Sequence, residues 1–151
     1  MDLKVEKIRI GAEVAIRGKR PMKGFFFVVP TSYPVPDADV LLRLLNEFDS
    51  YMPFERAKKI FLINKNQISY LKLPRNAATR DWEGEPKRKI RILLSTGQEI
   101  AGTISVDLPV ERQRVLDFLN LNTLFFLMKC PKEVYLVNKQ HLHGVSPMDL
   151  K

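Results

Sequence analysis

Ile60-Phe61-Leu62-Ile63-Asn64-Lys65 decides the fold, because the chain repeats it later as Val134-Tyr135-Leu136-Val137-Asn138-Lys139. We call the shift that carries Ile60 onto Val134 the repeat offset. In the ungapped alignment of residues 42–68 with residues 116–142, 7 of 27 positions are identical. Composition alone would give about two identities. We therefore interpret the chain as a tandem duplication of one small unit.

The duplication extends upstream with a change of spacing. Lys7-Ile8-Arg9-Ile10 recurs as Lys89-Ile90-Arg91-Ile92, at a longer spacing than the repeat offset. Because these two segments lie further apart than the repeat offset, the alignment predicts 8 additional residues in the first copy, between its opening strand and its helix. We expect them in the proline-rich stretch of residues 30–36.

Each copy is expected to fold as strand, strand, short helix, strand, strand. The fold class is therefore mainly β, with two tandem small bent sheets or barrels. In the second copy, Gly97 suits a turn, Gly102 marks a bend, and one helix runs from Pro109 to Asn120. In the first copy the helix begins at Asp37. The strands expected in the second copy are residues 89–94, 99–106, 123–130, 134–137 and 141–145.

The predicted domain organisation is a first β repeat at residues 1–74, a linker at 75–86 and a second β repeat at 87–151. The linker is polar, has no hydrophobic period and is bounded by two prolines. Trp82 is its single large apolar residue, and we expect it to pack on a neighbouring repeat. The sequence leaves open whether the repeats form separate barrels or share one sheet.

Parts of both copies resemble the two short motifs of Sm-like proteins. The residues that carry the first resemblance are Ile90, Arg91, Ile92, Gly97, Ile100, Gly102, Ile104 and Asp107. They are similar to two bent strands around a turn glycine, with a second glycine where the sheet bends. Residues 60–68 and 134–142 resemble the second motif, a strand, a tight turn and another strand. The resemblance covers about half of each copy, and it implies small SH3-like barrels that use edge strands to build oligomers.

The residues with which Sm-like proteins read RNA are not matched. Asn64-Lys65 and Asn138-Lys139 stand where that family has an Arg-Gly pair. A helix is inserted after Asp107, where the family places an asparagine. The resemblance therefore does not imply a uridine pocket here.

The positive net charge of the chain favours binding to polyanions such as nucleic acids. The 151 residues include 25 Lys+Arg against 17 Asp+Glu, a net charge of +8. Three basic clusters are candidate phosphate or nucleic-acid contacts, because such contacts release counterions. The first cluster is Arg17, Lys19, Arg20 and Lys23; the second is Arg56, Lys58 and Lys59; the third is Lys87, Arg88, Lys89 and Arg91. A solvated basic surface is the alternative interpretation.

Catalytic chemistry has few candidates. The chain has one cysteine, Cys130, and two histidines, His141 and His143. The histidines share a face of the last strand, but zinc needs a third ligand. No Gly-x-Ser-x-Gly, Walker-type loop or His-Glu-x-x-His motif occurs. We predict a protein that is not an enzyme, with no cofactor and no bound metal.

The apolar run of residues 24–29 is too hydrophobic for a bare edge, so Phe25, Phe26, Phe27 and Trp82 are candidate interface residues. We expect an assembly or adaptor module of the bacterial cytoplasm that binds protein partners and itself, as a homo-oligomer. The alternative is an RNA- or DNA-binding protein that uses the basic clusters. A third interpretation is a small-ligand sensor in a cleft between the copies. The segment 1–6 has no signal-peptide core and no apolar run is long enough to span a bilayer, so no membrane association is expected.

Overall fold

The chain builds one antiparallel sheet, which the computed structural model describes over residues 7–30, 32, 34–75 and 79–148. Ten strands form this sheet and two α-helices accompany it among the described residues, which confirms the prediction of a mainly β protein. Each half has three strands after its helix, where the expected strand, strand, helix, strand, strand pattern has two. The N-terminal segment 1–6, residues 31 and 33 of the proline-rich stretch, residues 76–78 of the predicted linker and residues 149–151 lie outside the described residues. The strand order is β10-β6-β7-β8-β9-β5-β1-β2-β3-β4, so the sheet is open and has β10 and β4 at its edges.

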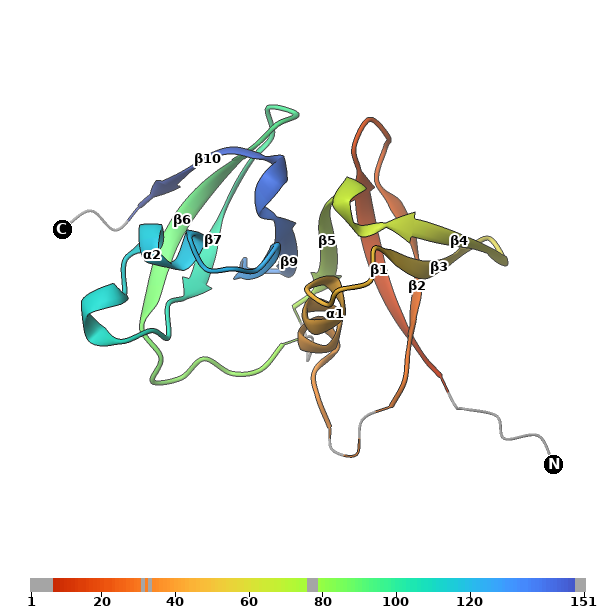
Figure 1. Cartoon of the computed structure of the whole chain (residues 1–151), viewed down its shortest axis with the longest axis horizontal. Coiled ribbons are helices and arrows are strands. Elements are labelled where there is room, and N and C mark those ends of the chain that lie inside the picture. The colour runs from red at the N-terminus through yellow and green to blue at the C-terminus, as the bar shows by residue number, and fades with distance from the viewer. Residues whose placement is uncertain (1–6, 31, 33, 76–78, 149–151) are drawn as a thin grey trace.

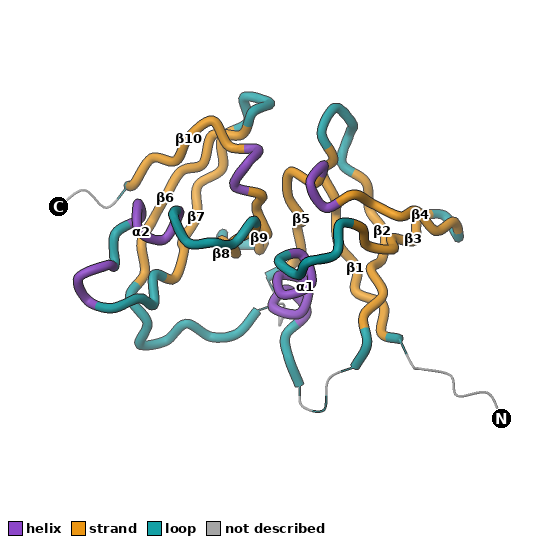
Figure 2. Tube along the Cα trace, in the orientation of Figure 1, coloured by secondary structure: helices purple, strands orange, loops and turns teal. Residues whose placement is uncertain are grey.

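The two halves of the chain occupy the two halves of the sheet (Figure 1). The first half supplies β1 (Ile8–Ile16), β2 (Met22–Val28), α1 (Asp37–Leu45), β3 (Tyr51–Arg56), β4 (Lys59–Asn64) and β5 (Ile68–Pro74). The second half supplies β6 (Lys87–Leu94), β7 (Glu99–Ser105), α2 (Val115–Leu119), β8 (Phe125–Lys129), β9 (Glu133–Asn138) and β10 (Leu142–Pro147). Three short 3-10 turns complete the chain, η1 (Lys65–Gln67), η2 (Val110–Arg112) and η3 (Lys139–His141), and Figure 2 shows them as short helical segments among the strands.

The halves are joined where β5 pairs with β9, a contact that we call the seam. Five residues of each strand pair in antiparallel register, from Tyr70 opposite Val137 to Pro74 opposite Glu133. Because side chains alternate along a strand, the seam contributes to both faces of the sheet. Leu71 and Leu136 enter the core of the first half, whereas Tyr70 and Val137 enter the core of the second half. Each core therefore contains side chains from both halves of the chain.

Helix α1 covers one face of the seam. Asp37 and Asp39 lie in its first turn, where acidic side chains favour the helix dipole. Its buried residues include Leu41 and Leu45, which belong to the same core as Phe125 of β8. The helix therefore packs against strands of the other half, as Figure 1 shows near the middle of the molecule.

Two glycines allow neighbouring strands to approach closely. A Cβ atom on Gly102 would lie 2.6 Å from Met128 Cγ and 2.9 Å from Lys129 O. A Cβ atom on Gly24 of β2 would collide with Phe54 and with a backbone oxygen of β3. The glycine at position 102 is thus explained by contact with β8, because that strand leaves no room for a side chain.

The helix expected from Pro109 to Asn120 is wrong in its extent. The structure has the 3-10 turn η2 followed by the separate short helix α2. Arg114 is extended, with ψ of 154°, and its backbone N–H and guanidinium both donate to the Asp117 carboxylate. This local pairing starts a second helix and interrupts the first.

The strand pairing does not follow the predicted alignment of the first strand. Ile8 pairs with Val28, whereas Ile90, which the sequence alignment equated with Ile8, pairs with Gly102. Gly24, which makes the same kind of close approach in the first half, pairs with Ala12, so Ala12 and not Ile8 has the pairing position that Ile90 has in the second half. Short alternating segments such as Lys-Ile-Arg-Ile match at several registers, so the sequence alone does not determine the alignment of this strand.

The segment between β5 and β6 contacts both halves. Trp82 is 5% exposed and lies in the core of the first half, beneath the Lys129 ammonium, which is 4.1 Å from its ring centroid. Arg75 donates to Cys130 O, and the Arg80 backbone N–H donates to Asp39.

Replacing Gly102 with alanine should lower the free energy of unfolding by about 1–3 kcal/mol, because the added methyl group must displace the backbone of β8. Chemical denaturation measures the change. Gly144→Ala is the matched control, since its Cβ would meet no atom within 4 Å. Equal stability of the two variants would contradict the close approach of β7 and β8.

Candidate functional site

Strand β4 presents an apolar, unpaired edge. It is the last strand of the sheet, and no described strand lies beyond it. Ile60, Phe61 and Leu62 are 64%, 49% and 71% exposed. Three consecutive exposed apolar residues on an edge strand are a template for pairing with another chain.

The backbone of β4 is oriented for such pairing at Leu62. Lys65, just after the strand, donates its N–H to Ser50 O at 2.8 Å, on the side of β3. Since N–H groups alternate sides along an extended strand, the N–H and C=O of Leu62 point away from β3. Leu62 also lies opposite Pro53 in the pairing with β3. The open side of β4 therefore offers both a donor and an acceptor at its centre.

Strand β9 shows the same apolar sequence when a neighbour covers it. Val134 and Leu136 are fully buried, whereas Ile60 and Leu62, which align with them at the repeat offset, are mostly exposed. Strand β9 lies between β8 and β5, but β4 has only β3 beside it. The difference in exposure follows from the number of neighbours and not from the residue types.

The opposite edge of the sheet is β10. The Met148 N–H donates to Lys89 O at 2.9 Å, on the side of β6. By the same alternation, the N–H and C=O of Val145 point outward, while Pro147 has no N–H to offer. Strand β10 thus also presents a free donor and acceptor near its centre.

The three basic clusters lie at separate places (Figure 1). Arg17, Lys19 and Arg20 are exposed at the turn between β1 and β2, and Lys23 follows in β2. Arg56, Lys58 and Lys59 form the turn between β3 and β4, at the far side of the first half. Lys87, Arg88, Lys89 and Arg91 lie in β6, in the other half of the sheet. The structure does not bring the clusters together into one surface.

The candidate aromatic interface residues divide between core and surface. Phe26 is fully buried and Trp82 is 5% exposed, so both pack inside the chain. Phe27 is half-buried. Phe25 is 41% exposed, and the Arg9 guanidinium lies 4.2 Å from its ring centroid.

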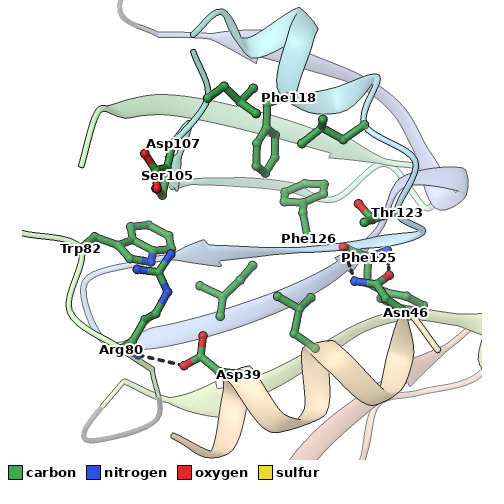
Figure 3. A pocket seen from close by; sticks show the side chains of 14 residues that line it. Asp39, Asn46, Arg80, Trp82, Ser105, Asp107, Phe118, Thr123, Phe125 and Phe126 are labelled. Carbon is green, nitrogen blue, oxygen red and sulfur yellow. Dashed lines mark hydrogen bonds between the residues drawn. The ribbon is translucent and has the colours of Figure 1, made fainter. Parts of the chain in front are cut away.

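A pocket of about 260 Å³ opens between α1, the Trp82 segment and the strands of the second half (Figure 3). Phe118 and Phe126 form one aromatic wall, with ring centroids 5.6 Å apart. Arg80, Asp39 and Asp107 supply charge at the opposite side.

Arg80, Asp39 and Asn46 of this pocket have hydrogen-bond partners within the chain. Arg80 donates its guanidinium to Glu85 at 2.8 Å and its backbone N–H to Asp39 at 2.9 Å. The amide of Asn46 exchanges two hydrogen bonds with the backbone of Phe125, at 2.8 and 3.1 Å. The Ser105 hydroxyl is buried without a hydrogen-bond partner among the described residues. The Asn46 contact joins the two halves of the chain, and Ser105 and Asp107 lie side by side at the pocket (Figure 3).

A wider hollow of about 640 Å³ lies on the sheet over β1, β2 and β5, and its lining includes Gly11, Gly24 and Phe25. Lys72 crosses it and pairs with Glu13 at 3.0 Å and with Glu133 at 3.8 Å. The hydrogen bond to Glu13 raises the pKa of Lys72 above its ordinary value. Lys72, Glu13 and Glu133 are therefore paired with one another within the chain.

His141 is a structural residue of the seam. It is 1% exposed. Its Nε2–H donates to Asn66 O at 2.8 Å, because a carbonyl oxygen can only accept. In the neutral ring Nδ1 is then the acceptor, and it accepts from the Ser69 hydroxyl at 2.7 Å. Both partners belong to the first half of the chain. Burial lowers the pKa of His141 below its usual 6.5; the hydrogen bond to Asn66 opposes this shift, and the charge of Arg17 adds to it.

Cys130 is placed as a buried thiol. Its Sγ–H donates to Ala101 O at 3.2 Å, and burial raises its pKa to about 11. A thiol with this pKa stays protonated at neutral pH and is a poor nucleophile. Within the described ranges, no three His, Cys, Asp or Glu side chains are grouped to hold a metal ion.

The sequence did not single out Ile60 and Leu62 as surface residues. Their repeat counterparts are apolar as well, so the pattern is the same for an edge strand and a central strand. Only the strand order distinguishes the two.

Comparison of the chain with family models, curated proteins and solved structures finds no match. In the described part of the chain, no helix has the length and apolar character needed to cross a membrane.

The neutral form of His141 should stabilise the fold, because its pKa lies below 6.5 in the folded chain and near 6.5 in the unfolded chain. This contribution is complete above pH 6.5 and is lost as the pH falls through the folded-state pKa. Chemical denaturation at pH 7.5 and at lower pH should show reduced stability in acid. His141→Gln should weaken this dependence and His143→Gln should retain it; identical pH profiles of the two variants would contradict the assignment.

Proposed function

We propose that the chain is a non-enzymatic assembly module, built from a duplicated β unit, that binds protein partners by strand addition at its free sheet edge β4. The exposed apolar edge of β4 carries the proposal. Strand addition gains affinity from backbone hydrogen bonds and specificity from alternate side chains. Leu62 supplies an outward donor and acceptor, and its exposed neighbours supply apolar surface.

Corresponding contacts in the two halves support the duplication. The pairing of β5 with β1 shifts register between Ile68 and Tyr70, and the pairing of β10 with β6 shifts between Leu142 and Gly144. These two sites are related by the repeat offset. A bulge recurring at the same point favours a common origin, because each bulge needs its own local backbone geometry.

The Asn-Lys turns support the duplication in the same way. The Asn64 side chain accepts from the N–H two residues later at 3.0 Å, and the Asn138 side chain does so at 2.9 Å. The ammonium groups of Lys65 and Lys139 each donate to a backbone carbonyl near the end of the preceding helix. The conformational preference of asparagine for turns explains why both turns contain it. The turn geometry does not require the lysine contacts, so their recurrence is the stronger support for a duplication.

Nucleic-acid binding is the competing function. The net charge of +8 favours it, but the basic clusters lie at separate places along the sheet. The salt dependence of binding distinguishes these two functions. Binding through phosphates weakens steeply with added salt, whereas apolar strand pairing does not.

Affinity capture from native extract, with and without nuclease, tests the proposal. The wild-type chain should retain protein partners in both conditions and at raised salt. Leu62→Lys should lose them, because a charge on the edge opposes pairing. Leu116→Lys is the matched control for β4, since Leu116 is 58% exposed on α2, in the other half of the chain from β4.

Three results would contradict strand addition at β4. Loss of all captured material after nuclease treatment would favour the nucleic-acid function. Equal capture by Leu62→Lys and the wild-type chain would exclude the β4 edge. Equal losses in Leu62→Lys and Leu116→Lys would show that any added charge disrupts binding.

A further inference from the structure

We infer that the partner strand for β4 is β10 of a second copy of this chain, paired in the register of the seam. This inference rests on the proposed function and names its partner. Each chain would then join two neighbours head to tail, with β4 on one side and β10 on the other.

The seam supplies the template for the contact. Leu71 of β5 lies opposite Leu136 of β9. The repeat offset carries Leu71 forward onto Val145 of β10, and it carries Leu136 back onto Leu62 of β4. The two free edges of the molecule are therefore the counterparts of the two strands that already pair inside it.

Backbone orientation agrees with this register. In the seam, Arg75 donates its N–H to Lys132 O at 3.1 Å, which directs the N–H of Leu71 toward β9 as well. The N–H groups of Leu62 and Val145 both point to the open sides of their strands. A Leu62–Val145 pair can therefore exchange two hydrogen bonds, as the seam geometry requires. If the register shifted by one residue, backbone groups that point toward the inner neighbours would lie opposite each other, and both intermolecular hydrogen bonds would be lost.

One side-chain contact beside the seam has counterparts near the two edges of the sheet. Asn46, at the end of α1, binds the backbone of Phe125 through both atoms of its amide. By the repeat offset, the counterpart of Asn46 is Asn120 at the end of α2, and that of Phe125 is Tyr51 at the start of β3. Both are exposed. In the proposed contact, Asn120 of one chain binds the Tyr51 backbone of the next.

Charge sets the conditions for association. Each chain carries +8, so copies repel one another at low salt. Added salt screens this repulsion and should strengthen self-association. Because the contact joins two different edges, repetition gives a closed ring or an open filament and not an isologous pair.

The test uses two variants of the full chain, each with one blocked edge. Leu62→Pro removes the outward N–H of β4, and Val145→Pro removes that of β10, while both leave the inward N–H groups unchanged. Light scattering after size exclusion should show wild-type assemblies and monomers of each variant. A mixture of the two variants should form a one-to-one dimer, because each retains the edge that the other lacks.

Control variants keep the result interpretable. Thermal melting checks that the proline variants fold; if either does not, Leu62→Lys and Val145→Lys replace them in the same mixing experiment. Asn120→Ala should raise the dissociation constant about tenfold, the effect of losing one or two hydrogen bonds. Asn122→Ala, an exposed asparagine in the same loop, should not.

Several outcomes overturn the inference. A wild-type monomer at high concentration and raised salt, a Val145→Pro variant that still self-associates, or a mixture that stays monomeric would each exclude β4–β10 pairing. If partner capture in the extract still depends on Leu62, the proposed function survives without self-pairing. If that dependence is also absent, both proposals fail.

Discussion

The pairing of β5 with β9 is the contact on which the rest of the structure depends. Its side chains alternate between two cores, so neither half of the chain encloses its own apolar residues completely. Helix α1 packs across it, the His141 ring joins it at one end, and the amide of Asn46 links α1 to β8 beside it. Loss of this pairing would expose apolar surface on both faces of the sheet, which is a far larger cost than the loss of five backbone pairs.

The same constraint defines the free edges. A strand pattern that is fully buried in β9 is largely exposed in β4, although the residue types are similar. An apolar edge of this kind is a liability unless something covers it, because it pairs readily with any compatible strand. Under the proposed duplication, the chain carries the appropriate covering strand at its other edge. Assembly and avoidance of nonspecific aggregation would then depend on the same backbone contact.

Much of the fold follows from the sequence, because alternation and turn residues act locally. The strand ends predicted for the second half agree with the observed ends to within about two residues. The Asn64-Lys65 and Asn138-Lys139 turns lie between strands, as the sequence pattern predicts. The pairing of the first strand of each half could not be predicted in the same way, since the repeated Lys-Ile-Arg-Ile segments fit several alignments. The break before α2 depends on the Arg114–Asp117 pair, which hydrophobic periodicity does not report. The candidate site depends on which strand is last in the sheet, and no local pattern around Leu62 encodes that order.

Amide hydrogen exchange at Leu62 tests the central claim most directly, because this N–H is free in the monomer and bonded in the proposed contact. Leu136 is the internal reference, since its N–H lies within the seam at every concentration. The account predicts that Leu62 becomes protected as protein concentration rises and exchanges rapidly on dilution, while Leu136 stays protected throughout. Rapid exchange at Leu62 under all conditions would contradict the account, and so would rapid exchange at Leu136 in the folded chain.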